Sequence, residues 1–196
     1  METNEPIMTE QESLQVIQQM IQSAKQEFHD KSFYYLLWGW LVFIASIGQF
    51  VLMTAGFAHP EIVWLLMPVG GVITSIYGRN ENKKKKVKTY FDEFNKHALV
   101  SFLVSLFMVL GFQQKLQINC YPMVVMVYGC WLYISGGALR FKPLMIGGVI
   151  NWLLAAASFL VDFKIQLLLL AAAVLLGYII PGYMLKSRYQ KSLHSN

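Results

Sequence analysis

The chain has 196 residues, of which 56% are hydrophobic and only 14% are charged. An ordinary soluble protein carries roughly 25% charged residues, so this composition argues against a soluble globular domain. The formal net charge is +5, but the basic residues stand between long apolar blocks. That placement is typical of residues that orient a chain in a membrane and argues against nucleic-acid binding.

The apolar blocks are about twenty residues long, the length at which a helix crosses a hydrocarbon layer of roughly 30 Å. A β-barrel would instead need stretches of about ten residues with strict polar and apolar alternation. Residues 167–176 are apolar throughout, without any alternation. The expected fold class is therefore all-α, an integral membrane bundle of six transmembrane helices with a cytoplasmic amphipathic helix before it.

Residues 1–32 are predicted to form a cytoplasmic leader. Thr9 and Glu12 match a Thr-x-x-Glu capping box, which predicts a helix over about residues 10–29. Its apolar stripe keeps helical spacing and consists of Leu14, Ile17, Ile21 and Phe28. The opposite face is rich in glutamine rather than in lysine or arginine, so a cytoplasmic protein or a second copy of the chain is expected to cover the stripe, rather than anionic lipid.

Six apolar segments follow the leader. The predicted spans are residues 33–54, 62–77, 98–112, 121–139, 143–161 and 165–185. Residues 79–97 form a basic loop between the second and third spans, and residues 186–196 form a C-terminal tail. The last three spans have short connectors, which make neighbouring helices antiparallel.

The basic residues predict the orientation of these spans. With both termini in the cytoplasm, fourteen of the sixteen basic residues lie on the cytoplasmic side, and only Lys115 and Lys164 lie outside. This distribution satisfies the positive-inside preference and indicates a multi-pass protein of the cytoplasmic (inner) membrane. A lysine run in the basic loop is either a topological anchor or a contact for anionic lipid head groups, and it comprises Lys83, Lys84, Lys85, Lys86 and Lys88.

No pattern in the sequence indicates catalysis. The four histidines are scattered, and no spacing of Cys, His, Asp or Glu resembles a metal site or a nucleophile with its base. The chain is therefore expected to be no enzyme and to need no cofactor or metal. No ionisable residue stands near the middle of a predicted span, which argues against proton-coupled transport. Polar residues at depth, such as Gln49, are expected to bridge helices.

A short repeat raises a different hypothesis. The motif Gly-Gly-Val-Ile at residues 70–73 recurs at residues 147–150. Two three-span units related by an inverted repeat would place the copies in opposite orientation, as in several transporter folds. The residues that follow the two motifs, Thr74 and Asn151, are then a candidate polar site near mid-membrane depth. The simpler interpretation is that each residue only hydrogen-bonds its own or a neighbouring helix.

The leader and the start of the first span carry a family resemblance. The sequence of residues 14–21, followed by Leu-Leu-Trp-Gly-Trp at residues 36–40, resembles a group of small bacterial polytopic membrane proteins with no assigned activity. This resemblance covers the first quarter of the chain and implies a companion of small cytoplasmic regulators rather than an enzyme. It transfers no functional residue.

Two functional hypotheses therefore stand. The first is a non-catalytic inner-membrane protein that regulates, senses or scaffolds through its leader helix. The alternative is a small-solute or ion transporter or channel built from an inverted three-helix repeat.

Overall fold

The computed structural model describes the backbone of residues 10–84 and 90–194 and the side chains of residues 32–79, 93–188 and 190. All regular structure in these ranges is helical, which confirms the predicted all-α class. The main helices are α1 (Glu10–Thr54), α2 (Leu66–Lys84), α3 (Tyr90–Gly111), α5 (Cys120–Ala138), α6 (Lys142–Ser158), α7 (Phe163–Val174) and α8 (Ile180–His194). Shorter turns are a 3-10 helix at Pro60–Leu65, α4 at Gln113–Leu116, a 3-10 turn at Gln117–Asn119 and a π-helical turn at Leu175–Ile179.

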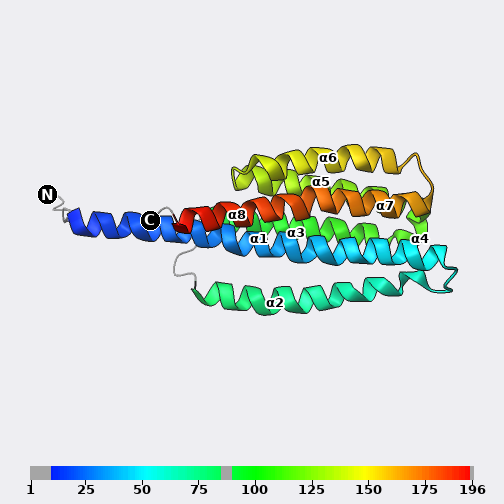
Figure 1. The fold of residues 1–196 in the computed structure, drawn as a ribbon, viewed down its shortest axis with the longest axis horizontal. Helices are drawn as coiled ribbons and strands as arrows, with labels where there is room; N and C mark the ends of the chain where they lie inside the picture. Colours follow the sequence, from blue (N-terminus) through cyan, green and yellow to red (C-terminus); the bar gives the residue numbers. More distant parts are fainter. Residues whose placement is uncertain (1–9, 85–89, 195–196) are drawn as a thin grey trace.

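Helix α1 is one uninterrupted helix of 45 residues, about 68 Å long at 1.5 Å per residue. The predicted leader helix and the predicted first span are therefore parts of one rod. The sequence explains this continuity, because residues 10–38 contain no glycine or proline that would break a helix. Figure 1 shows the N-terminal part of α1 extending beyond the ends of the other helices.

Four rods form the packed core of the bundle: α1, α5, α6 and the continuous rod of α7, the π-helical turn and α8. Helices α5 and α6 approach each other at glycines. A Cβ on Gly148 would lie 2.9 Å from the carbonyl oxygen of Gly129, so no larger residue fits there without movement. Fully buried leucines, including Leu132, Leu144 and Leu170, fill the space between the rods. The glycines expected to mark close packing do so at these positions.

The two remaining long helices lie at the periphery. Helix α2 and its preceding 3-10 helix pack along α1, while α3 packs along α5. In Figure 1, α2 runs along one side of the bundle next to α1. Most described side chains of both helices are exposed, and most of these are apolar.

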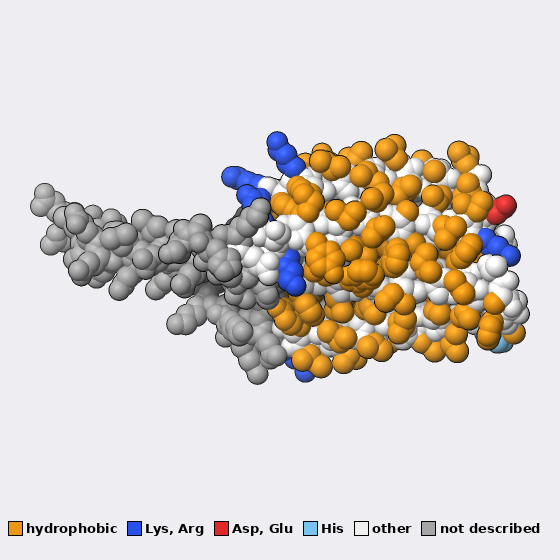
Figure 2. All heavy atoms as spheres, viewed as in Figure 1, with side chains coloured by type: hydrophobic (Ala, Val, Ile, Leu, Met, Phe, Trp, Pro, Cys, Tyr) orange, Lys and Arg blue, Asp and Glu red, His pale blue; other side chains and the backbone are white. Residues whose placement is uncertain are grey.

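Five stretches of helix are long and apolar enough to cross a membrane: Ser32–Thr54, Pro60–Arg79, Glu93–Gly111, Gln113–Ala138 and Phe163–Arg188. The predicted fifth span, residues 143–161, overlaps α6, a shorter apolar helix of 17 residues. Figure 2 shows hydrophobic side chains over the flank of the bundle and charged side chains mainly at its two ends. This architecture is compatible with a multi-pass membrane protein.

Candidate functional site

The last rod contains an irregularity near its middle. The α-helical hydrogen-bonding pattern of α7 gives way to a π-helical turn at Leu175–Ile179 before α8 begins. Such turns widen the helix locally, are rare, and are found frequently at functional sites. Gly177 and Tyr178, both in this turn, are buried against the neighbouring rods. The π-helical turn is therefore the centre of the candidate site.

Asn151 of α6 reaches the start of this turn from the opposing helix. Its side chain is fully buried, and its Nδ2 donates to the carbonyl oxygens of Gly147 at 2.9 Å and of Ala173 at 3.0 Å. The second bond joins α6 to α7 just before the π-helical turn. Its Oδ1 is buried and accepts no hydrogen bond from the described residues. One half of the amide thus bridges two helices, while the other half is an unused buried acceptor.

Two glycines create the space that the asparagine occupies. A Cβ on Gly177 would clash with the Asn151 side-chain amide, and a Cβ on Gly147 would lie 2.9 Å from the Gly177 Cα. The backbones of α6 and the π-helical turn are therefore in direct contact. This arrangement holds the amide rigidly and leaves little room for a ligand beside it.

A cluster of tyrosines lies on the other side of the π-helical turn. The ring centroid of Tyr178 is 6.0 Å from that of Tyr35 on α1 and 5.4 Å from that of Tyr128 on α5. The Tyr178 hydroxyl is buried and has no hydrogen-bond partner in the described part of the chain. The turn consequently contacts α1, α5 and α6 at once.

Two buried glutamines, Gln49 and Gln166, make a second set of polar contacts. Gln49 lies near the C-terminal end of α1. The Oε1 of Gln49 accepts hydrogen bonds from Trp64 Nε1 and from the Tyr121 hydroxyl, both at 2.7 Å. Gln166 Nε2 donates to the backbone carbonyl of Ser158 at 3.1 Å. The first contact joins α1, the 3-10 helix and α5. Sequence reasoning gave Gln49 a bridging role in general but missed these partners, because no spacing pattern pairs residues so far apart in the chain.

The structure does not bring Thr74 and Asn151 together. Thr74 lies on α2, whose extensive contacts are with α1 and the 3-10 helix, whereas Asn151 lies on α6, which packs against α5 and the last rod. Figure 1 places α2 and α6 on opposite sides of the bundle. The Thr74 Oγ1 is buried and has no described hydrogen-bond partner. The two residues occupy separate environments rather than one polar cavity.

The other predicted sites lie outside the described side chains. The leader residues Leu14, Ile17, Ile21 and Phe28 belong to α1, whose backbone is described there, but their side chains are not. Lys83 and Lys84 end α2, again without described side chains, and Lys85, Lys86 and Lys88 fall outside the described ranges.

Among the described residues, no group of three or more His, Cys, Asp or Glu side chains is placed to hold a metal ion. The polar groups at the π-helical turn are amide, hydroxyl and backbone carbonyl groups, which bridge helices and carry no net charge. Comparisons with protein-family models, with curated proteins and with solved structures find no match to this chain.

Proposed function

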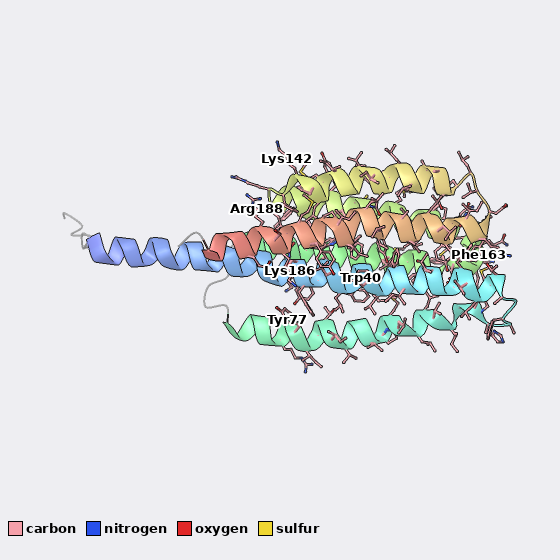
Figure 3. All side chains as sticks on the ribbon, viewed as in Figure 1. Trp40, Tyr77, Lys142, Phe163, Lys186 and Arg188 are labelled. Atoms are coloured by element: carbon pink, nitrogen blue, oxygen red, sulfur yellow. The ribbon has the colours of Figure 1, made fainter. Side chains whose placement is uncertain are left out.

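We propose that this chain is a multi-pass protein of the cytoplasmic membrane with six crossings and both termini in the cytoplasm. Five long apolar helices and the shorter α6 support six crossings. Figure 3 supports the orientation, since Lys142, Lys186 and Arg188 lie at the same end of the bundle and Phe163 at the other end. The basic end is the cytoplasmic end by the positive-inside preference.

Thiol labelling tests this orientation. The native Cys120 is buried, so the assay uses a chain with Cys120 and Cys130 replaced by alanine and one new cysteine at an exposed terminus of a helix. Lys164→Cys is expected to react with a membrane-impermeant maleimide in intact spheroplasts, and Lys142→Cys only after lysis. The reverse pattern would contradict the orientation.

Within this topology, we propose a non-catalytic regulatory role, in which the leader part of α1 docks a cytoplasmic protein or a second copy of the chain. The observation that carries this proposal is the continuity of α1 from Glu10 to Thr54. A helix without a glycine or proline before Gly39 has no hinge at the membrane surface. Binding at the leader therefore shifts the same rod that lies in the bundle.

A close contact between α1 and the π-helical turn would transmit this shift. A Cβ on Gly39 of α1 would lie 2.9 Å from the Ile179 side chain and 3.0 Å from that of Tyr178, both in the π-helical turn. Movement of α1 along or about its axis consequently changes the packing of the turn. The proposed mechanism is mechanical: a docking event outside the bilayer is relayed through α1 to the least regular turn of the bundle.

Charge substitutions on the two faces of the leader test the docking step. At 100° per residue, Ile17 and Ile21 fall on the apolar stripe, and Gln19 and Gln26 fall nearly opposite. The variant Ile17→Glu/Ile21→Glu is expected to lose self-association or partner capture in membrane cross-linking while it still inserts normally. The matched variant Gln19→Glu/Gln26→Glu adds the same charge and should retain both. Equal association of the two variants would remove the leader from the mechanism.

The transporter hypothesis gains no support from the positions of its candidate residues. It needs a polar cavity shared by Thr74 and Asn151, and these side chains lie on helices at opposite sides of the bundle.

A further inference from the structure

An apolar groove of about 320 Å³ runs along α1 at the basic end of the bundle. Its floor is formed by residues of the first turns of the apolar part of α1, including Leu36, Leu37, Trp40 and Leu41, and Lys186 of α8 stands at its edge. The volume is at the lower end of the roughly 300–1,000 Å³ range of small-molecule sites. The groove is separate from the buried candidate site at the π-helical turn, because the groove opens on the surface of the bundle.

The neighbours of α1 explain why the groove exists. On one side, Leu36 packs under α8, where a Cβ on Gly182 would lie 3.1 Å from it. On the other side, Phe33 stacks on Tyr77 of α2, with ring centroids 4.2 Å apart. The strip of α1 between these two contacts remains uncovered, and Trp40 is 40% exposed there. In Figure 3, Trp40 lies on α1 between α2 and the rod formed by α7, the π-helical turn and α8, and Lys186 lies toward the basic end.

The length and polarity of the groove match one half of a bilayer. The apolar stretch of α1 begins at Ser32, and Leu41 lies nine residues further, which corresponds to about 13 Å along the helix. One leaflet contributes about half of the roughly 30 Å hydrocarbon thickness. Lys186 stands near the end of the apolar stretch Phe163–Arg188, so its ammonium group is at head-group depth. An acyl chain along α1 would thus place its phosphate near this lysine.

The positive charge of Lys186 favours an anionic head group at the groove over a neutral one. Among the described residues, no carboxylate forms an ion pair with its ammonium group. A cation at the membrane surface attracts anionic head groups. From this combination we infer that the groove is a binding site for an anionic phospholipid of the leaflet at the basic end, with an acyl chain on Leu37 and Trp40 and the head group at Lys186. The site is separate from the lysine run of the basic loop and requires only that the bundle lies in a bilayer.

Tryptophan quenching by brominated lipids tests this site in the full-length protein. The protein is placed in phosphatidylcholine nanodiscs that contain a small fraction of phosphatidylglycerol with dibrominated acyl chains, or the same fraction of dibrominated phosphatidylcholine. Stronger quenching by the phosphatidylglycerol is expected, and Trp40→Phe should abolish this difference. Lys186→Ala should lower the preference roughly fivefold, the equivalent of about 1 kcal/mol per basic residue.

Lys142→Ala is the matched control, because Lys142 is an exposed lysine at the same end of the bundle but on α6. It should keep the full preference for phosphatidylglycerol. Equal quenching by both lipids in the unmodified protein would overturn the inference, as would equal losses in the two lysine variants. Weak quenching of Trp40 by both lipids would show that protein, such as a second copy of the chain, covers the groove, and would also overturn it. Melting temperatures of all variants verify that each is folded.

Discussion

Helix α5 of the four-rod core and the peripheral helices α2 and α3 have similar mean hydropathies but differ in how much of each is buried. The apolar stretch Pro60–Arg79, which contains α2, has a mean hydropathy of 1.4, and 6% of its apolar window is buried. The stretch Glu93–Gly111 of α3 has a mean hydropathy of 1.5, and 0% of its apolar window is buried. The stretch that contains α5 has a lower mean hydropathy of 1.3, yet 39% of it is buried. Hydropathy therefore identifies helices that suit a membrane without distinguishing those that pack against protein from those that face lipid.

Close contact between backbones is what distinguishes the core. Gly129 of α5 and Gly147 and Gly148 of α6 lie against backbone atoms of neighbouring elements, whereas an added Cβ on Gly71 of α2 would have no atom of another helix within 4 Å. Substitutions that add bulk or remove polar atoms should consequently separate the two regions.

The largest effect is expected from glycine substitution. Gly147→Leu must displace the backbone of Gly177, so it should lower the free energy of unfolding by at least about 3 kcal/mol or prevent folding altogether. Gly71→Leu on α2 should change it by less than about 0.5 kcal/mol. Reversible unfolding in mixed micelles measures both values. Similar losses for the two variants would mean that the periphery is packed as tightly as the core.

Substitution of Asn151 should lower the free energy of unfolding, whereas substitution of Thr74 should not. Asn151→Ala removes the hydrogen bond to Ala173 and leaves a cavity, which should cost about 1–2 kcal/mol. Thr74→Val replaces a buried hydroxyl that has no described partner with a methyl group of the same shape, so it should be neutral or slightly stabilising. The same unfolding assay decides the sign. A marked loss for Thr74→Val would reveal a partner of this hydroxyl and with it a structural role for α2.

A smaller effect is expected where the periphery is tied to the core. Gln49→Met leaves the Trp64 indole and the Tyr121 hydroxyl without their shared acceptor, at a cost of about 1 kcal/mol. A double-mutant cycle with Trp64→Phe should show coupling, because the first substitution has already removed the bond that the second affects. Additive losses of the free energy of unfolding would contradict the hydrogen bond between Gln49 and Trp64.

The smallest effect is expected for an exposed apolar side chain of α3. Phe107 is 68% exposed, so Phe107→Leu should change the free energy of unfolding by less than about 0.5 kcal/mol. The core residue Leu132 is fully buried, and Leu132→Ala should cost about 2–5 kcal/mol. A large loss for Phe107→Leu would identify a protein partner for α3.

Sequence patterns predicted the helical class and the presence of several apolar helices, because the length and polarity of a membrane-crossing helix are local properties. The capping box at Thr9 and Glu12 predicted a helix over about residues 10–29; those residues belong to α1, while Thr9 itself lies outside the described residues. The glycine pairs predicted close packing, which holds for Gly147 and Gly148 but not for Gly71. A glycine allows a second helix to pack closely, but the glycine does not determine which helix packs there.

The parts that the sequence did not predict depend on pairings between distant segments. Nothing local to residues 175–179 indicates a π-helical turn, and its neighbours Asn151 and Tyr128 come from distant segments of the chain. The separation of Thr74 from Asn151 is likewise a matter of helix order in space. The similar motifs before these two residues therefore give no measure of their distance.

The packing of α1 against α7, the π-helical turn and α8 has a consequence for biosynthesis. Helix α1 is synthesised before α7, the π-helical turn and α8, so it finds these neighbours only after they have been made. Of the elements with extensive contacts to α1, only α2 and the 3-10 helix are made before then. Contacts between such distant parts of a chain form late and slowly. A chain truncated before Phe163 would leave uncovered the face of α1 that packs against α7, the π-helical turn and α8.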